Sequence, residues 1–275
     1  MTSKMPTHDP AQGRRSGLPI AWLVNEAHVV QGSHEERMLH PVVVEKPPRW
    51  YTPSTRLELP GELAKLTPGD DAAVLRFAKI YGLLGYWYFM PENESVEGPV
   101  GDSLKWVWAH AETVRLVLSL KDKLDQEDAE GLEQTLRKLE HPTLRGQFPV
   151  KFAARGILRT LVFYPTSSHR SLAASILMSI VNENISGIHP KIAWDEKRGI
   201  FVPYSSFSTL IEVVYWHLSN VLSGGRVTRC ETCGGRFIQT DRRQRFCPTG
   251  TKQESPCAVK ARVREWREGN KKQAK

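Results

Sequence analysis

All four cysteines of the chain lie within one short, arginine-rich stretch near the C-terminus. They are Cys230, Cys233, Cys247 and Cys257, with two, thirteen and nine residues between successive members. Four thiolates can complete a tetrahedral shell around one zinc ion, and a Cys-x-x-Cys pair is a tight turn that lets two sulfurs reach the same ion. The spacing therefore predicts one structural Zn²⁺ site, because four protein sulfurs leave no position open for a water or a substrate.

Three other uses of these thiols fit the sequence less well. Disulfides are rare in the reducing cytoplasm, where we expect the chain because its start lacks the apolar core of a secretory signal. A redox Cys-x-x-Cys would need a thioredoxin-like strand–helix–strand context, which the sequence does not predict. Unrelated free thiols would not gather in one tenth of the chain. Residues 1–17 are polar and contain Pro and Gly, which predicts a disordered tail.

The residues between the cysteines predict a hairpin. Gly234 and Gly235 follow the first cysteine pair directly and permit the left-handed backbone that its turn needs. Residues 236–240 predict a strand, and residues 245–247 predict the strand that returns. This hairpin would bring Cys247 beside the first pair.

The fourth cysteine lies at a predicted helix start. Ser255 is a favourable N-cap and Pro256 a favourable first helical residue. Cys257 would then lie in the first turn, where free backbone N–H groups stabilise a thiolate. The predicted elements are a cysteine turn, then a hairpin, then a helix that supplies the last ligand. This is the order of elements in a treble-clef finger. A segment with so few large apolar residues needs the metal in order to fold.

This stretch resembles the CGNR-type zinc finger family, found at the C-terminus of bacterial proteins described as transcription regulators. In that family a helix precedes Cys-x-x-Cys, a Phe and an Asp follow, and an Arg-rich turn, an aromatic-Cys pair and a last Cys opening a basic helix complete the finger. The matching positions here are Cys230, Cys233, Phe237, Asp241, Arg242, Arg243, Arg245, Phe246, Cys247 and Cys257.

The resemblance covers about the last third of the chain and implies zinc ligation and a role in regulation. Ala258, Val259 and Lys260 stand where the family has Gly-Asn-Arg, and the gap between the last two cysteines is longer. We therefore interpret the chain as a divergent member.

Positive charge is concentrated in the same segment. Residues 226–275 hold fourteen Lys and Arg against five Asp and Glu, a net +9, whereas residues 1–225 hold twenty-four against twenty-five, a net −1. This segregation indicates an anionic partner, and phosphate backbones bind such cationic surfaces. We predict nucleic-acid binding, with DNA favoured, through cations of the hairpin turn and the last helix. These are Arg242, Arg243, Arg245, Lys260, Arg262, Arg264 and Arg267.

The last helix also carries an apolar stripe. Val259, Val263 and Trp266 are spaced i, i+4 and i+7, which places them on one helical face. We expect this stripe to pack on the finger or on the preceding domain.

Residues 18–225 predict a mostly helical α+β domain. Helical spacing of apolar residues, with capping residues at the starts, marks its helices. A period-two pattern over 189–204 predicts a hairpin with Gly199 in its turn. Gly224 and Gly225 end the last helix, and we place the boundary with the finger, residues 226–275, at this pair. The predicted helices begin near Asp70 or Asp71, Asp102 or Ser103, Asp125, His169 and Ser205.

No motif predicts catalysis, so we do not expect an enzyme. The sequence lacks a Gly-x-Ser-x-Gly motif, a phosphate-binding loop and a dinucleotide fingerprint. It also lacks a run of about 18 apolar residues, so no membrane span is predicted. The larger domain is expected to sense an effector, form a homodimer or bind a partner. The alternative function is a protein–protein interaction module in which the zinc finger is purely structural.

Overall fold

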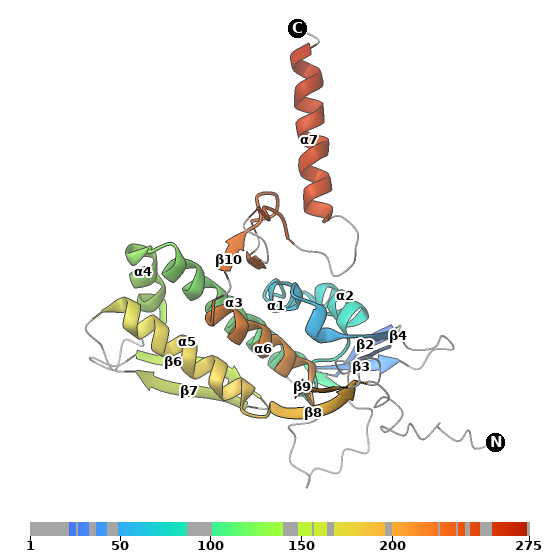
Figure 1. Cartoon of the computed structure of the whole chain (residues 1–275), viewed down its shortest axis with the longest axis vertical. Coiled ribbons are helices and arrows are strands. Elements are labelled where there is room, and N and C mark those ends of the chain that lie inside the picture. Colours follow the sequence, from blue (N-terminus) through green and yellow to red (C-terminus); the bar gives the residue numbers. More distant parts are fainter. Residues whose placement is uncertain are drawn as a thin grey trace, which may run out of the picture.

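Helices pack together at the centre of the computed structural model, and small antiparallel sheets of two or three strands surround them (Figure 1). The predicted mixed helix-and-strand class is therefore correct, whereas the predicted tail, residues 1–17, lies outside the described residues. The structure describes residues 22–25, 27–32, 37–42, 49–86, 101–139, 148–155, 157–163, 168–195, 200–224, 226–234, 236–239, 243–247 and 255–273.

The helix α3, Leu104–Asp125, is the central element of the core. It contacts α1, α4, α5 and β6, and its predicted apolar stripe is buried along its length. The other helices of this part bury one or two apolar faces in the same cluster. They are α1 (Leu59–Leu63), α2 (Asp71–Tyr81), α4 (Ala129–Leu139), α5 (His169–Ile185) and α6 (Leu210–Leu222), preceded by the short 3-10 turn Pro53–Thr55.

The capping residue predicted for α2 is confirmed, whereas the side chains predicted to cap α3 do not do so. The Asp70 carboxylate accepts a hydrogen bond from the Ala73 N–H at 2.9 Å, as expected for an N-cap of α2. In contrast, Asp102 does not cap α3. Its buried carboxylate instead accepts hydrogen bonds from the backbone N–H groups of Gly85 and Tyr86, at 2.9 and 2.8 Å, and so fixes the chain that follows α2.

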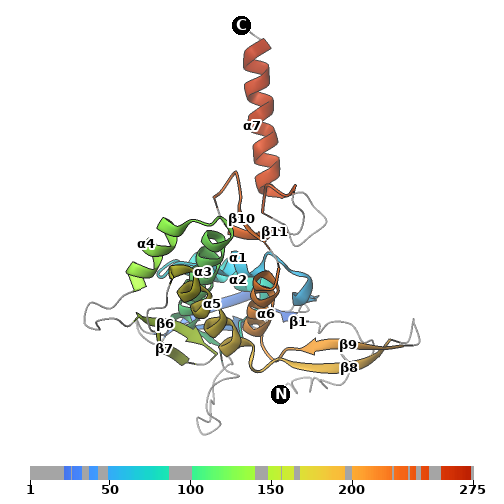
Figure 2. The same cartoon turned by 60° about the vertical axis from the view of Figure 1, so that its left-hand side comes forward.

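The strands form small antiparallel sheets rather than one large sheet. The predicted hairpin is confirmed as β8–β9, which extends away from the helices (Figure 2). The hairpin β6–β7 was not predicted, and β6 packs against α3 and α5. The strands of this part are β1 (Trp22–Val24), β2 (Ala27–Gln31), β3 (Met38–Val42), β4 (Arg49–Tyr51), β5 (Asp102–Ser103), β6 (Phe148–Ala154), β7 (Ile157–Phe163), β8 (His189–Asp195) and β9 (Ile200–Ser206).

The cysteine-bearing segment is attached to this helical core by two strands. β10, Arg226–Arg229, contacts α3, and β11, Arg236–Gln239, contacts α1. Val227 of β10 belongs to the hydrophobic core. The last helix, α7 (Pro256–Gln273), points away from the rest of the molecule (Figures 1 and 2). Among the described residues, no helix has the length and apolar character needed to span a membrane.

Candidate metal centre

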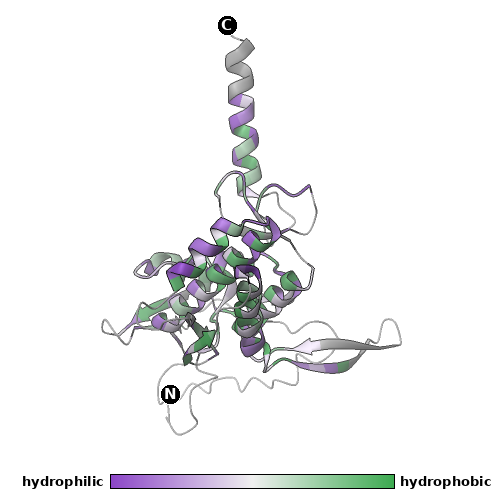
Figure 3. Ribbon diagram, turned by 90° about the vertical axis from the view of Figure 1, so that its left-hand side faces the viewer, coloured by the Kyte–Doolittle hydropathy of each residue, from purple (hydrophilic) through white to green (hydrophobic). Residues whose placement is uncertain are grey.

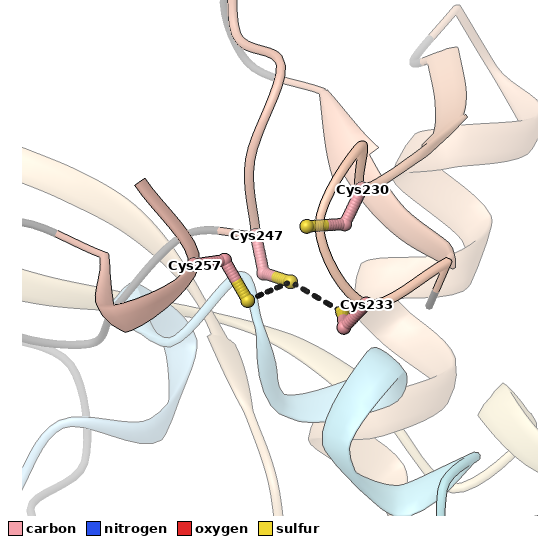
Figure 4. Close-up of side chains that lie close together, drawn as sticks. All are labelled: Cys230, Cys233, Cys247 and Cys257. Carbon is pink, nitrogen blue, oxygen red and sulfur yellow. Dashed lines mark hydrogen bonds between the residues drawn. The ribbon is translucent and has the colours of Figure 1, made fainter. Parts of the chain in front are cut away.

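The side chains of Cys230, Cys233, Cys247 and Cys257 converge from separate segments of the chain (Figure 4). Their sulfurs all lie within 4.8 Å of one another. The Cys247 Sγ is 3.3 Å from the Cys233 Sγ and 3.8 Å from the Cys257 Sγ. Sulfurs bound tetrahedrally to one zinc-sized ion, at about 2.3 Å, are separated by about 3.8 Å. The four cysteines are thus arranged to bind one metal ion.

The first two cysteines lie at the tip of the β10–β11 hairpin. Arg226 pairs with Gln239 and Arg229 with Arg236, so the Cys-x-x-Cys stretch is the turn between these strands. The Gly234 N–H donates to the Cys230 carbonyl at 2.9 Å, and Gly234 has a φ of +68°, which is the left-handed conformation expected of it.

The predicted return strand at 245–247 is wrong, because β11 pairs with β10 instead. Val227 anchors β10 in the helical core, which makes β10 the available partner for β11. Residues 243–247 form an irregular segment beside the hairpin. The Glu231 N–H donates to the Arg245 carbonyl at 3.1 Å, and the Gln239 side chain donates to the Gln244 carbonyl at 3.2 Å. These bonds still bring Cys247 to the first pair.

The fourth cysteine lies in the first turn of α7, as predicted. The Cys257 N–H donates to the Ser255 hydroxyl at 3.2 Å, which is the expected contact of a serine N-cap. The Thr232 hydroxyl donates to the Cys257 carbonyl at 2.9 Å and so ties the start of α7 to the Cys-x-x-Cys turn. Thr232 was not predicted as part of the centre, although its position between two ligands in the sequence is a signal that could have identified it.

Backbone amides favour the thiolate of Cys230. Burial alone would raise its pKa, but backbone N–H groups of Cys233, Cys247 and Thr232 point at the sulfur and lower the pKa to about 6. Hydrogen bonds to an anion stabilise the charged form. These hydrogen bonds therefore favour the ionised form of Cys230, the form that binds a metal ion.

Burial and the neighbouring sulfurs oppose the ionisation of Cys247 and Cys257. Burial raises the pKa of Cys247, and the neighbouring Cys230 and Cys233 sulfurs raise it further. Burial also raises the pKa of Cys257, and this effect outweighs the predicted stabilisation of its thiolate by the helix start. Thiols this close together can all be ionised only when a cation lies among them, because their negative charges repel one another. An all-thiolate donor set fits zinc or another soft or borderline metal ion.

A cation from the helical core lies beside the cluster. Lys65, just after α1, donates to the Glu62 carboxylate at 2.6 Å. Burial alone would lower the pKa of Lys65, but this hydrogen bond and the charge of Glu62 raise it, and the nearby Cys247 and Cys233 act in the same direction. Lys65 thus offsets part of the negative charge of the thiolates. Sequence analysis missed it because no local pattern links α1 to cysteines so distant in the chain.

An ion pair joins the finger to the central helix. The Arg229 guanidinium lies 3.3 Å from a carboxylate oxygen of Asp122, which is fully buried in α3. The Gln126 side chain donates to the other oxygen at 2.6 Å. A buried carboxylate that loses one charged partner is costly.

Arg229→Met is expected to reduce the free energy of unfolding by about 1–3 kcal/mol, because the buried Asp122 carboxylate loses a charged hydrogen-bond partner. Urea denaturation followed by circular dichroism measures this loss. Lys138→Met, at an exposed position on α4, is the control and should change stability by less than about 0.5 kcal/mol. Equal stability of the two variants would contradict a role for this ion pair.

The predicted cations lie at different places around the centre. Arg245 is paired with Glu231, with Nε 2.6 Å from the carboxylate, and so its charge is partly balanced within the finger. Arg243 is exposed, while Arg242 lies outside the described residues. The four predicted cations of α7 are exposed: Lys260, Arg262, Arg264 and Arg267.

The apolar stripe of α7 does not pack as expected. Val259 and Val263 are each 41% exposed and Trp266 is 67% exposed. Ala261, on the opposite side of the helix, is buried instead. Only the first turns of α7 lie beside the finger, and the C-terminal part of the helix projects away from the other elements (Figure 3). The expected packing fails because α7 projects outward.

No protein family, curated protein or solved structure matches this chain. The resemblance to the CGNR-type finger therefore depends on the residues quoted above. The described geometry establishes a four-cysteine cluster that could hold a metal ion.

Proposed function

We propose that this chain is a cytoplasmic, nucleic-acid-binding regulatory protein, with DNA as the favoured ligand, and that its four-cysteine centre holds one structural Zn²⁺. The observation that carries the proposal is the pairing of this centre with an outward-pointing cationic helix. Because four sulfurs fill a tetrahedral shell, the metal would have no open position for catalysis. We therefore propose a binding protein rather than an enzyme.

The helix α7 is the element proposed to contact the ligand. Lys260, Arg264 and Arg267 are exposed and spaced i, i+4 and i+7, so they lie within about 60° of arc on one face. A helix that stands clear of its own protein can approach a phosphate backbone or enter a major groove. Thr232, Cys257 and the metal fix the start of α7, so the finger would hold this face at a defined angle.

Fluorescence anisotropy with a labelled DNA duplex tests the proposal. The full chain is expected to bind, and its affinity should fall steeply as salt rises, because displaced counterions drive the binding of cations to phosphates. A titration repeated at two salt concentrations measures this dependence. Absent binding, or an affinity that salt does not change, would remove duplex DNA as the ligand.

The competing function is a protein–protein interaction module, and the exposed stripe of Val259, Val263 and Trp266 is the observation that favours it. Apolar residues at i, i+4 and i+7 are the anchors with which a helix fills a groove. The anisotropy titration separates the two functions, because an apolar contact is far less sensitive to salt than a phosphate contact.

A further inference from the structure

Trp266 is a large aromatic side chain held away from the protein. It is 67% exposed, on a stretch of α7 that stands clear of the other elements (Figure 3). The buried Ala261 marks the side of the helix that faces the finger. Trp266 lies about 140° around the helix from Ala261, since each residue advances by about 100°. Its indole therefore faces outward with Val259 and Val263.

Cations border this aromatic side chain. Arg267 follows it directly and belongs to the stripe with Lys260 and Arg264, which lies about 100° around the helix from the apolar stripe. Arg262, one turn before Trp266, is exposed on the other flank of the apolar stripe. The outer side of α7 thus offers an aromatic face between positive charges.

An exposed indole bordered by cations restricts the class of ligand that α7 could bind. A second copy of α7 would bring the same positive charges against these, which disfavours pairing between helices. A nucleic-acid duplex offers negative charge, but its bases are stacked on one another and leave no face for an indole. A single strand offers both phosphates and exposed base faces, the pair of features that aromatic side chains in cationic surfaces bind.

We infer that α7 binds single-stranded nucleic acid, with Trp266 stacking on a base while Lys260, Arg264 and Arg267 contact the phosphates. This inference rests on the proposed function and narrows its ligand from nucleic acid in general to a single strand. Stacking tolerates any base, so the site would show little sequence preference.

The test compares three labelled probes with the zinc-loaded full chain: an oligo-dT and an oligo-U strand, each of about 20 nucleotides, and a duplex of equal length. The wild-type protein is expected to bind at least one strand more tightly than the duplex. Trp266→Ala should weaken strand binding about tenfold, whereas Trp266→Phe, which keeps a stacking ring, should weaken it by less than about threefold. Trp50→Ala removes another exposed tryptophan, on β4, and should have no effect.

The outcomes separate this inference from the proposed function. Tighter binding to the duplex than to either strand, or equal strand binding by wild type and Trp266→Ala, would overturn the single-strand inference alone. If salt-dependent duplex binding remained in that case, the proposed function would stand. Loss of binding to all three probes in the wild type would overturn both. The oligo-dT and oligo-U arms show whether DNA or RNA is the preferred strand.

Discussion

Cys247→Ser is expected to reduce the bound metal from about one ion per chain to nearly none, and chelation of the wild-type protein should have the same effect. The Cys247 Sγ lies 3.3 Å from the Cys233 Sγ and 3.8 Å from the Cys257 Sγ. Its loss would leave the metal ion with three sulfur ligands. Structural zinc contributes about 10–16 kcal/mol to small fingers. Elemental analysis of the purified protein measures the metal content directly.

The structural effect should be confined to the segment that the metal holds. The core around α3 buries its own apolar residues, and β10 stays attached to it through Val227 and Arg229. We therefore expect hydrogen exchange to increase in residues 243–247 and at the start of α7, while α3 and α6 keep their protection.

Thr232→Val is the matched control for this experiment. It removes the hydroxyl that donates to the Cys257 carbonyl but leaves all four sulfurs in place. It should retain one metal ion per chain and show only faster exchange at the start of α7. Full metal content in Cys247→Ser would mean that the cluster does not act as a four-sulfur site.

The features that could be predicted from the sequence are those that depend on nearby residues. Helix starts follow from caps such as Asp70, and the hairpin at 189–204 follows from alternating apolar residues around a turn. The four cysteines could be grouped because no other part of the chain has a thiol. Each of these signals lies within a short window of sequence.

The features that were missed depend on contacts between distant segments. The strand β11 pairs with β10 because Val227 is anchored in a core formed mainly by helices far earlier in the chain. Lys65 lies near the cysteines because α1 contacts β11. The exposure of Trp266 follows from the direction of α7, which the cysteine turn and its bond from Thr232 set. Periodicity places a stripe on a helix but does not show what covers it.

Replacing Lys260, Arg264 and Arg267 together by Gln is the second variant with a large expected effect. At about 0.1 M salt, each lost phosphate contact removes the release of roughly one counterion, so three losses should weaken DNA binding about 100-fold. The slope of the logarithm of affinity against the logarithm of salt should become shallower by about 2 to 3. Anisotropy titrations over a range of salt measure both quantities.

The matched control replaces Lys79, Lys138 and Lys151 by Gln, which are exposed cations on α2, α4 and β6. Both triple variants lower the formal net charge from +8 by three, to +5. If net charge alone attracted DNA, the two variants would weaken binding equally. If the face of α7 makes the contacts, the control should keep the wild-type salt slope, because its cations lie on other elements and release no counterions at the binding site. An equal loss of DNA affinity in the two variants would therefore mean that the net charge of the whole chain, rather than the face of α7, attracts the DNA.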